Sequence, residues 1–128
     1  MHGLLISGFP NMFMIGFSQG TLATTRTYDM TVQTEHCVQI MDYCRSSGFD
    51  RLEVRPEAEA AWQTEMADKR VDHDGYFEAC TPGLLNLEGR GGQVYDYYYG
   101  AGPVAYRRQL ESWLAERIGD DLILGPPE

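Results

Sequence analysis

The most constraining feature of this sequence is a short apolar segment, NMFMIG, at residues 11–16. The segment is apolar on both faces of an extended chain, Pro10 precedes it, and a polar turn that includes Gly20 follows it. Such a segment is typical of a strand that is covered on both sides, as in the interior of a parallel sheet. The rest of the chain offers no evident partner strand. We therefore predict an α/β fold to which this chain contributes one short buried strand, with the neighbouring strands outside it.

Three helices are predicted, so the chain itself is expected to be mostly α-helical. Each has an apolar stripe at helical spacing together with a capping residue, a proline in the first turn or a glycine stop. The expected bounds are Ser18 or Thr21 to about Cys44 with Gly48 as the stop, Pro56 to about Arg70, and Pro103 to about Ile118 with Gly119 as the stop. The residues expected to be buried are Met30, Cys37, Ile40, Met41 and Cys44 in the first helix, Ala58, Ala61, Trp62 and Met66 in the second, and Tyr106, Leu110, Trp113, Leu114 and Ile118 in the third.

Between residues 71 and 102 the helical periodicity is lost, and glycines and Pro82 punctuate the sequence. An irregular run of about thirty residues is long for a loop in a compact domain. Loops of this length usually serve function or lie against something larger. We therefore expect a long irregular loop between the second and third helices.

The chain is acidic, with 19 Asp and Glu against 10 Lys and Arg and a formal net charge of -9. This charge repels a phosphate backbone, so we expect neither nucleic acid nor an anionic membrane surface as a partner. The sequence contains no run of 18 or more apolar residues that would span a membrane. Its first residues lack the basic segment of a signal peptide and are interrupted by Gly8 and Pro10.

The three cysteines, Cys37, Cys44 and Cys80, include no closely spaced pair. The first two lie seven residues apart in the predicted first helix, which separates their backbones by about 10 Å and exceeds disulfide reach. Free thiols indicate a reducing compartment, and we predict a cytoplasmic protein. The histidines His2, His36 and His73 do not have the spacing of metal ligands, so we expect no metal site.

The string Gly100 to Ala105 matches GxGxx[GA], the pattern of a dinucleotide-binding turn, between a β-prone run and a helix. Pro103 removes one amide that would face a phosphate, and only 23 residues follow Ala105. That remainder is too short to supply the second strand and acidic residue that hold the ribose. A turn into a proline-started helix is the favoured interpretation, and a nucleotide-binding fragment remains a weaker alternative.

Residues 17–21 have a different character, because they lie between the predicted strand and the predicted first helix. In doubly wound folds, this position binds anionic or electron-rich ligands at the free amides of the helix N-terminus. Gly20 would allow a ligand close to the backbone, and Ser18, Gln19 and Thr21 would supply hydrogen bonds. The alternative is an ordinary capped helix start.

Three strings together carry a resemblance to a known family: GFPNMF from Gly8, EAEAAW from Glu57 and CTPGLLNLEG from Cys80. In this order they resemble the C-terminal part of a class B flavoprotein monooxygenase of the Baeyer-Villiger type, and the resemblance covers nearly the whole chain. The family has two Rossmann-like dinucleotide-binding domains. The resemblance implies that residues 1–48 are the last strand and helix of the FAD-binding domain, and that residues 49–128 are C-terminal helices with a substrate-side loop.

The resemblance also implies a cofactor pair, FAD and NADPH, and the residues that would meet the flavin and the substrate. The flavin-facing residues would be Phe17, Ser18, Gln19, Gly20, Thr21 and Leu22, and the substrate pocket would include Cys80, Leu84, Leu85 and Asn86. Gly100 to Pro103 would belong to the family's YGxGP turn. No catalytic residue is assigned, because the two GxGxxG turns and the arginine and aspartate of the family lie upstream of this region.

Two departures from the family pattern bear on these expectations. Relatives carry aromatic residues and an asparagine where this chain has Leu84, Leu85, Asn86 and Leu87, which makes the expected pocket wall more aliphatic. Phe17 to Gly20 also differs from the family's usual turn.

We predict the C-terminal part of an enzyme that oxidises a small ketone to an ester or lactone, inactive without its N-terminal half. The alternative is a truncated, non-catalytic interaction module that associates with a separate N-terminal half.

Overall fold

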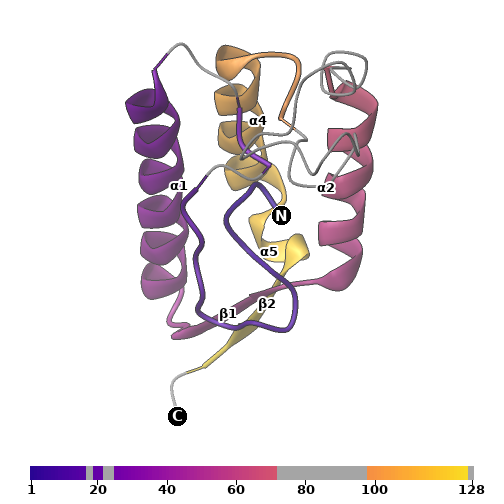
Figure 1. The fold of residues 1–128 in the computed structure, drawn as a ribbon. Helices are drawn as coiled ribbons and strands as arrows, with labels where there is room; N and C mark the ends of the chain where they lie inside the picture. Colours follow the sequence, from indigo (N-terminus) through magenta and orange to yellow (C-terminus); the bar gives the residue numbers. More distant parts are fainter. Residues whose placement is uncertain (17–18, 22–24, 72–97, 127–128) are drawn as a thin grey trace.

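The computed structural model describes residues 1–16, 19–21, 25–71 and 98–126 (Figure 1). Most of these residues are helical, as predicted. The elements in chain order are α1 (Arg26–Ser46), β1 (Arg51–Val54), α2 (Pro56–Lys69), α4 (Pro103–Glu116), α5 (Ile118–Asp121) and β2 (Leu122–Gly125).

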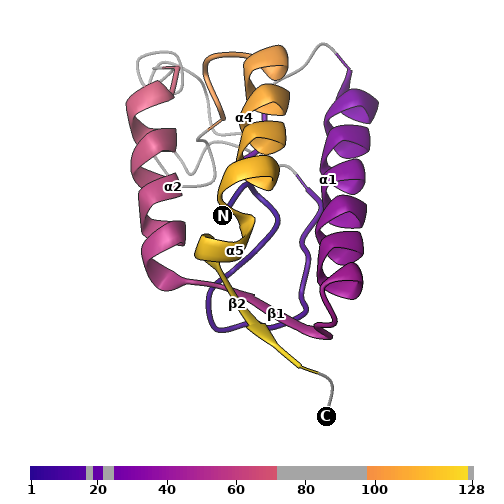
Figure 2. The ribbon, with the colours of Figure 1, turned by 180° about the vertical axis from the view of Figure 1, so that it is seen from behind.

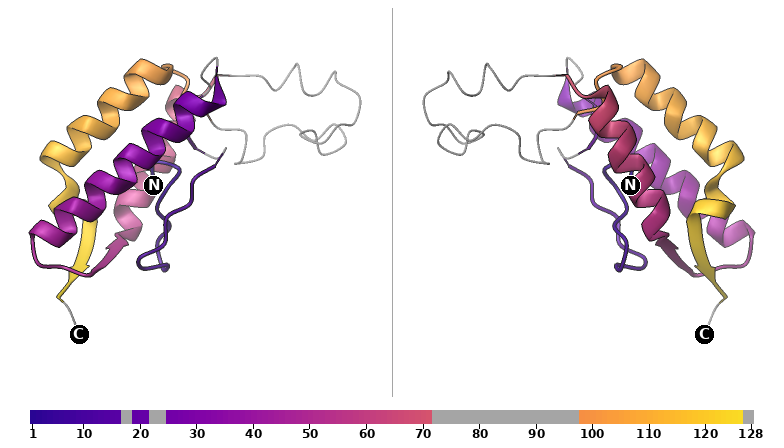
Figure 3. Two further views of the ribbon diagram at one scale, coloured as in Figure 1. Left: turned by 90° about the vertical axis from the view of Figure 1, so that its left-hand side faces the viewer. Right: turned by 90° about the vertical axis from the view of Figure 1, so that its right-hand side faces the viewer.

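The three long helices lie side by side, with α4 between α1 and α2 in the views from the front and from behind (Figures 1 and 2). The strands β1 and β2 cross one end of this layer. Residues 1–16 lie together on one side of the helices (Figure 3), and the start of this segment contacts α4 through His2. The N-terminal segment therefore contacts the helices and the sheet.

Helix α1 begins later than the sequence predicts. Thr25 takes the N-cap position with an extended backbone, so the expected caps at Ser18 or Thr21 are wrong. Gly48 has φ +77°, a left-handed conformation that stops the helix as expected. The burial of Cys37, Ile40 and Cys44 is confirmed, and the cysteines of α1 are free thiols as predicted.

Two methionines of α1 are not buried. Met30 is 38% exposed and Met41 is 47% exposed, although both were expected in the core. Polar residues occupy the inward face of α1 instead, among them Gln33 and His36. The apolar stripe read from the sequence therefore spans two faces of the helix, and the structure covers only one of them.

The proline starts of α2 and α4 are confirmed. Ala61 is exposed, contrary to prediction. Helix α4 ends at Glu116, and Gly119 lies inside the short helix α5 rather than at a helix end. Ile118 is nevertheless buried, because α5 turns it back into the core.

Residues 11–16, expected to form a strand, do not form one in this structure. Asn11 has φ +58°, which is outside the β region, and the amide of Met14 donates a hydrogen bond at 2.8 Å to the carbonyl of Leu4, which precedes the expected strand. Met14 and Ile15 are 48% and 46% exposed. An interior strand needs hydrogen-bonded strands along both of its edges and a packed layer over each of its faces, and no described strand pairs with residues 11–16.

The sheet that the structure does contain is the antiparallel pair β1–β2, which the sequence did not reveal. Leu52 pairs with Leu124 and Val54 pairs with Leu122. Each strand has only four residues, too few for a reliable alternating pattern. The pair joins the end of α1 to the C-terminal part of the chain.

One hydrophobic core connects all the long helices, and it includes residues from the first turn of the chain. Met1, Leu4 and Leu5 are at most 3% exposed. The hydroxyl of Tyr106 on α4 donates a hydrogen bond to the carbonyl of His2 at 2.7 Å. Among the described residues, no helix is both long and apolar enough to cross a membrane.

Candidate functional site

The structure describes half of the residues expected to face the flavin. Gln19, Gly20 and Thr21 are placed, whereas Phe17, Ser18 and Leu22 lie outside the described residues. The expected substrate-pocket residues, Cys80, Leu84, Leu85 and Asn86, also lie outside them. We refer to Gly16 and Gln19–Thr21, the described residues ahead of α1, as the approach segment.

The approach segment is joined to the chain that follows the long irregular run. The backbone amide of Tyr99 donates a hydrogen bond to the carbonyl of Gly20 at 2.8 Å. Tyr99 is 3% exposed, and its ring stacks on Trp62 of α2 with the centroids 5.8 Å apart. Tyr99, among the first described residues after the long irregular run, therefore lies beside the expected flavin-facing residue Gly20.

A buried glutamine of α1 contacts the approach segment at Gly16 and at Gly20. Gln33 is 0% exposed, and its Oε1 accepts a hydrogen bond from the amide of Gly16 at 3.2 Å. A Cβ placed on Gly20 would lie 2.9 Å from Nε2 of Gln33, so the side chain also lies against Gly20. The sequence analysis missed this residue, because a glutamine in a long helix has the pattern of a solvated face.

Thr21 is the one expected site residue whose polar atom is buried without a partner in the described part of the chain. Its side chain is 1% exposed, and Oγ1 makes no hydrogen bond there. Buried hydroxyl groups are nearly always hydrogen-bonded in folded proteins. The Thr21 hydroxyl is therefore free to meet a ligand with hydrogen-bonding groups.

The electrostatic surroundings of this site come from both helices that flank it. Lys69 at the end of α2 lies 2.6 Å from Oε1 of Glu65 and 2.9 Å from the Tyr99 hydroxyl. The hydrogen bond to Glu65, followed by the one to Tyr99, raises the pKa of Lys69. In the first turn of α1, Asp29 pairs with Arg26 at 3.7 Å, which offsets the negative charge of Asp29 near the helix N-terminus.

The dinucleotide-like turn at Gly100 to Ala105 does not have an open phosphate site. A Cβ on Gly100 would overlap the carbonyl oxygen of Lys69, so this glycine is required for close packing against α2. Gly102 has φ +88° and is the N-cap of α4. The structure therefore supports a turn into a proline-started helix.

A second candidate site is an open groove of about 740 Å³ between the C-terminal half of α1 and the N-terminal segment. Its lining is mainly apolar. The lining residues include Phe13, Val38, Met41, Phe49 and Leu52, with polar groups from Asn11, Asp42, Arg45 and Asp50 at its edges.

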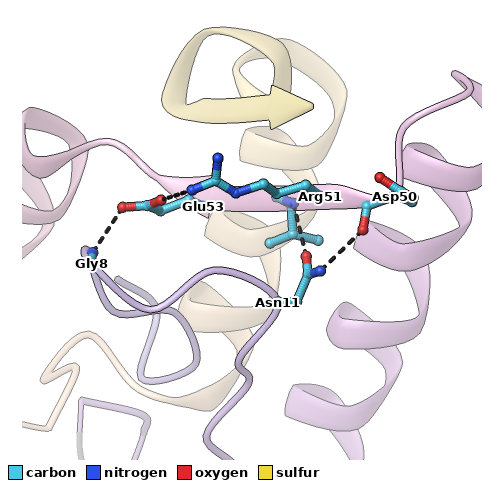
Figure 4. A network of polar contacts seen from close by, with 6 residues as sticks. Gly8, Asn11, Asp50, Arg51 and Glu53 are labelled. Atoms are coloured by element: carbon cyan, nitrogen blue, oxygen red, sulfur yellow. Dashed lines mark hydrogen bonds and ion pairs between the residues drawn. The ribbon is translucent and has the colours of Figure 1, made fainter. Parts of the chain in front are cut away.

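Asn11, at the edge of this groove, is hydrogen-bonded to the backbone at the start of β1 (Figure 4). Its side chain donates to the carbonyl of Asp50 at 3.1 Å and accepts from the amide of Leu52 at 2.9 Å, and its own amide donates to the Leu52 carbonyl at 2.9 Å. Close by, the amide of Gly8 donates to Glu53 at 3.0 Å. The GFPN string thus has a structural role that sequence reasoning did not assign.

The core beneath both sites contains a pair of buried histidines. Nε2 of His36 lies 3.3 Å from Nδ1 of His2, and both side chains are 2% exposed. The His2 ring meets Trp62 and Trp113 edge to face at 4.6 and 4.8 Å. Burial lowers the pKa of both histidines, that of His36 to about 4. The described residues contain no group of three His, Cys, Asp or Glu that would hold a metal ion.

Comparisons with known proteins identify the class. No family profile matches the chain. A Baeyer-Villiger monooxygenase of Streptomyces coelicolor is 31% identical over 126 residues, which are 98% of this chain and 20% of the relative. A solved polycyclic ketone monooxygenase of Thermothelomyces thermophila superposes with a TM-score of 0.79 at 28% identity, over 98% of this chain and 21% of that protein.

The fold is also shared with a cyclohexanone monooxygenase of Rhodococcus that was solved with NADP+ bound, with a TM-score of 0.74 at 20% identity over 98% of this chain and 23% of that protein. Over nearly its whole length, the chain is similar in fold and sequence to the C-terminal portion of Baeyer-Villiger monooxygenases. It spans about one fifth of the length of the curated relatives that it matches.

Proposed function

We propose that this chain is the C-terminal part of an FAD- and NADPH-dependent monooxygenase that converts ketones to esters or lactones, and that it forms one wall of the flavin and substrate pocket. The observation that carries the proposal is the alignment of nearly the whole chain with Baeyer-Villiger monooxygenases. The free thiols of Cys37 and Cys44 agree with a cytoplasmic location.

The approach segment fits a flavin on one observation in particular. The hydroxyl of Thr21 is buried and has no partner among the described residues, so it would gain a hydrogen bond from a polar edge of the isoalloxazine ring. The missing side chain of Gly20 makes room for the Gln33 amide, so the backbone of this segment lies close against α1. Together with Gln19, these residues would hold the flavin.

When bound, a flavin reduced by NADPH supplies the electrons that activate O2. The chain's own residues contribute placement and the exclusion of water. Tyr99 and Gln33 fix the approach segment against α1 and α2, and the Thr21 hydroxyl orients the ligand edge that it meets. The structure describes no acid or base of this chain in contact with that position, so we assign no proton transfer to it.

The partner in this proposal is the N-terminal half of the enzyme. The groove beside Asn11 includes the exposed side chains of Val38 and Met41, and Met14 and Ile15 of the N-terminal segment are exposed apolar side chains as well. Relatives carry about four fifths of their length outside the matched region. We propose that this additional polypeptide covers the surface and supplies the nucleotide phosphate sites.

The proposal predicts that the purified chain, mixed with FAD, NADPH and a cyclic ketone, gives no lactone. Adding the upstream polypeptide of the Streptomyces coelicolor relative should restore ketone-dependent NADPH oxidation. A chain with Met41→Lys should complement poorly, whereas Ala115→Lys, which adds the same charge at an exposed position of α4, should complement normally. Lactone formation by the isolated chain, or no complementation by any upstream polypeptide of the family, would overturn the proposal.

The second candidate function is a non-catalytic interaction module. The exposed apolar surface favours this alternative equally, because such a surface marks a protein contact whether or not a flavin is present. The two functions differ in the complex with the upstream polypeptide. A stable complex that binds FAD but never oxidises NADPH in response to ketone would identify the module.

A further inference from the structure

Gln33 is a polar residue in a position that helical packing would normally give to an apolar one. It is 0% exposed on the inward face of α1, and burying an amide without hydrogen bonds is costly. Its Oε1 accepts a hydrogen bond from the amide of Gly16 at 3.2 Å, whereas its Nε2 is buried without a hydrogen-bond partner in the described part of the chain. The buried glutamine therefore has a partner in the approach segment, seventeen residues earlier in the chain.

Gln33 is also matched to the absence of a side chain at Gly20. A Cβ there would lie 2.9 Å from Nε2 of Gln33, closer than real side-chain contacts allow. The amide end of a glutamine is flexible in general. Here it cannot withdraw without losing the bond from Oε1 to Gly16, so the two ends of the approach segment depend on one side chain.

Tyr99 fixes the same segment from the other side. Its amide bonds to the Gly20 carbonyl at 2.8 Å, and its hydroxyl is held by Lys69 at 2.9 Å. Two contacts therefore restrain Gly20. Its carbonyl accepts the hydrogen bond from Tyr99, and the Gln33 amide lies against its Cα. Thr21 follows directly, so its buried hydroxyl takes its position from these two contacts.

We propose that Gln33 is a positioning residue for the flavin: it does not touch the cofactor, but it sets the position at which the approach segment presents Thr21. This inference rests on the proposed function in one respect only, the identity of the ligand. The coupling of Gln33 to Gly16 and Gly20 is a property of this chain and is tested without any ligand.

The first test is amide hydrogen exchange of the full chain followed by NMR. Gln33→Leu removes the acceptor, and the exchange of the Gly16 amide should become about fivefold faster, as expected for the loss of one hydrogen bond. Gln33→Glu keeps an acceptor oxygen and should restore protection. Gln39→Leu, the same change at an exposed position of α1, should leave Gly16 unchanged. Equal Gly16 exchange in wild type and Gln33→Leu would overturn the proposal.

The second test is a double-mutant cycle on stability, which remains informative if Gln33→Leu folds poorly. Gly20→Ala should destabilise the wild-type chain but cost less in a Gln33→Ala background, where the contact is relieved. Gly16→Ala is the matched control, because a Cβ there meets nothing within 4 Å. An equal cost of Gly20→Ala in both backgrounds would contradict the coupling.

The third test uses the complex with the upstream polypeptide and FAD. Gln33→Leu should weaken FAD binding at least about fivefold and shift the flavin absorbance bands, and Gln33→Glu should restore both. Identical affinity and spectra in wild type and Gln33→Leu would overturn the positioning role. If the wild-type complex binds no FAD, the proposed function fails, whereas the exchange and stability results still decide whether Gln33 positions the segment.

Discussion

The indole Nε1 of Trp113 donates a hydrogen bond to Oδ2 of Asp121 at 2.8 Å, and this bond joins α4 to the end of α5. Both residues are buried. The carbonyl of Asp121 also accepts a hydrogen bond at 2.9 Å from the amide of Arg55, the residue just before α2. One aspartate therefore connects the helix that packs on His2 with the strand pair at the end of the helical layer.

Replacing Asp121 by alanine should lower the free energy of unfolding by about 1–3 kcal/mol, because it leaves the buried Trp113 indole without an acceptor. Arg117 also bonds to Asp121, but its side chain is 61% exposed and should contribute little. Urea unfolding measures the change. Asp120→Ala is the control, because Asp120 is exposed and bonds to Arg55 only through its carbonyl. Equal effects of the two substitutions would contradict the role of Asp121.

Asn11→Ala should cost more stability than Asn11→Gly, and the two together separate two effects. Both remove the side-chain bonds to Asp50 and Leu52, worth about 1–3 kcal/mol for the pair. Only alanine adds strain at φ +58°, about 1 kcal/mol. Urea unfolding of both variants checks the order. If Asn11→Gly is as stable as wild type, the bonds across β1 contribute nothing measurable.

Stability should fall with acid because of the buried histidines. Burial lowers the pKa of His36 in the folded protein to about 4, whereas the unfolded value is about 6.5. Between these values the unfolded state binds more protons, so the stabilisation is complete above pH 6.5 and is lost as pH falls towards 4, by about 3 kcal/mol for His36. Urea midpoints measured from pH 7.5 to 4 should show this loss. His36→Gln should flatten the profile, and a slope as steep as wild type in that variant would assign the pH dependence to other groups.

Gly100→Ala should destabilise the chain by about 1–3 kcal/mol, because a Cβ on residue 100 would overlap the carbonyl oxygen of Lys69. The end of α2 and the turn at Gly100 cannot move apart without displacing Tyr99. Gly16→Ala, with open space around its Cβ, should be close to neutral. Thermal unfolding of both variants provides the comparison. A neutral Gly100→Ala would mean that the turn has room for a side chain.

The helices were predictable from the sequence because their boundary signals are local. Pro56 and Pro103 mark the first turns of α2 and α4, and Gly48 provides the left-handed conformation that ends helix α1. The prediction that Met30 and Met41 are buried was wrong, because burial depends on non-local packing. An apolar stripe indicates which face needs cover, but not whether the polypeptide that covers it belongs to the same chain.

The candidate site was predictable only where residues follow one another in sequence. Gln19 to Thr21 were found from the turn before the first helix. Gln33 and Tyr99 were not, because their roles come from contacts with Gly16 and Gly20 that no local pattern encodes. The strand expected at residues 11–16 was wrong for a related reason. A strand is defined by a partner strand, and here only Asn11 is hydrogen-bonded to β1, through its side chain and its backbone amide.

The hydrogen bond between Tyr106 and the carbonyl of His2 spans 104 residues of chain, and this has a consequence for the order of folding. During synthesis the first residues leave the ribosome long before α4 exists, so their apolar side chains must wait for most of the chain to emerge. Closing so long a loop is slow compared with forming α1 or α2. The docking of residues 1–5 should therefore be a late event in folding, and the approach segment, which follows them in sequence, should reach its final position only after the last long helix has formed.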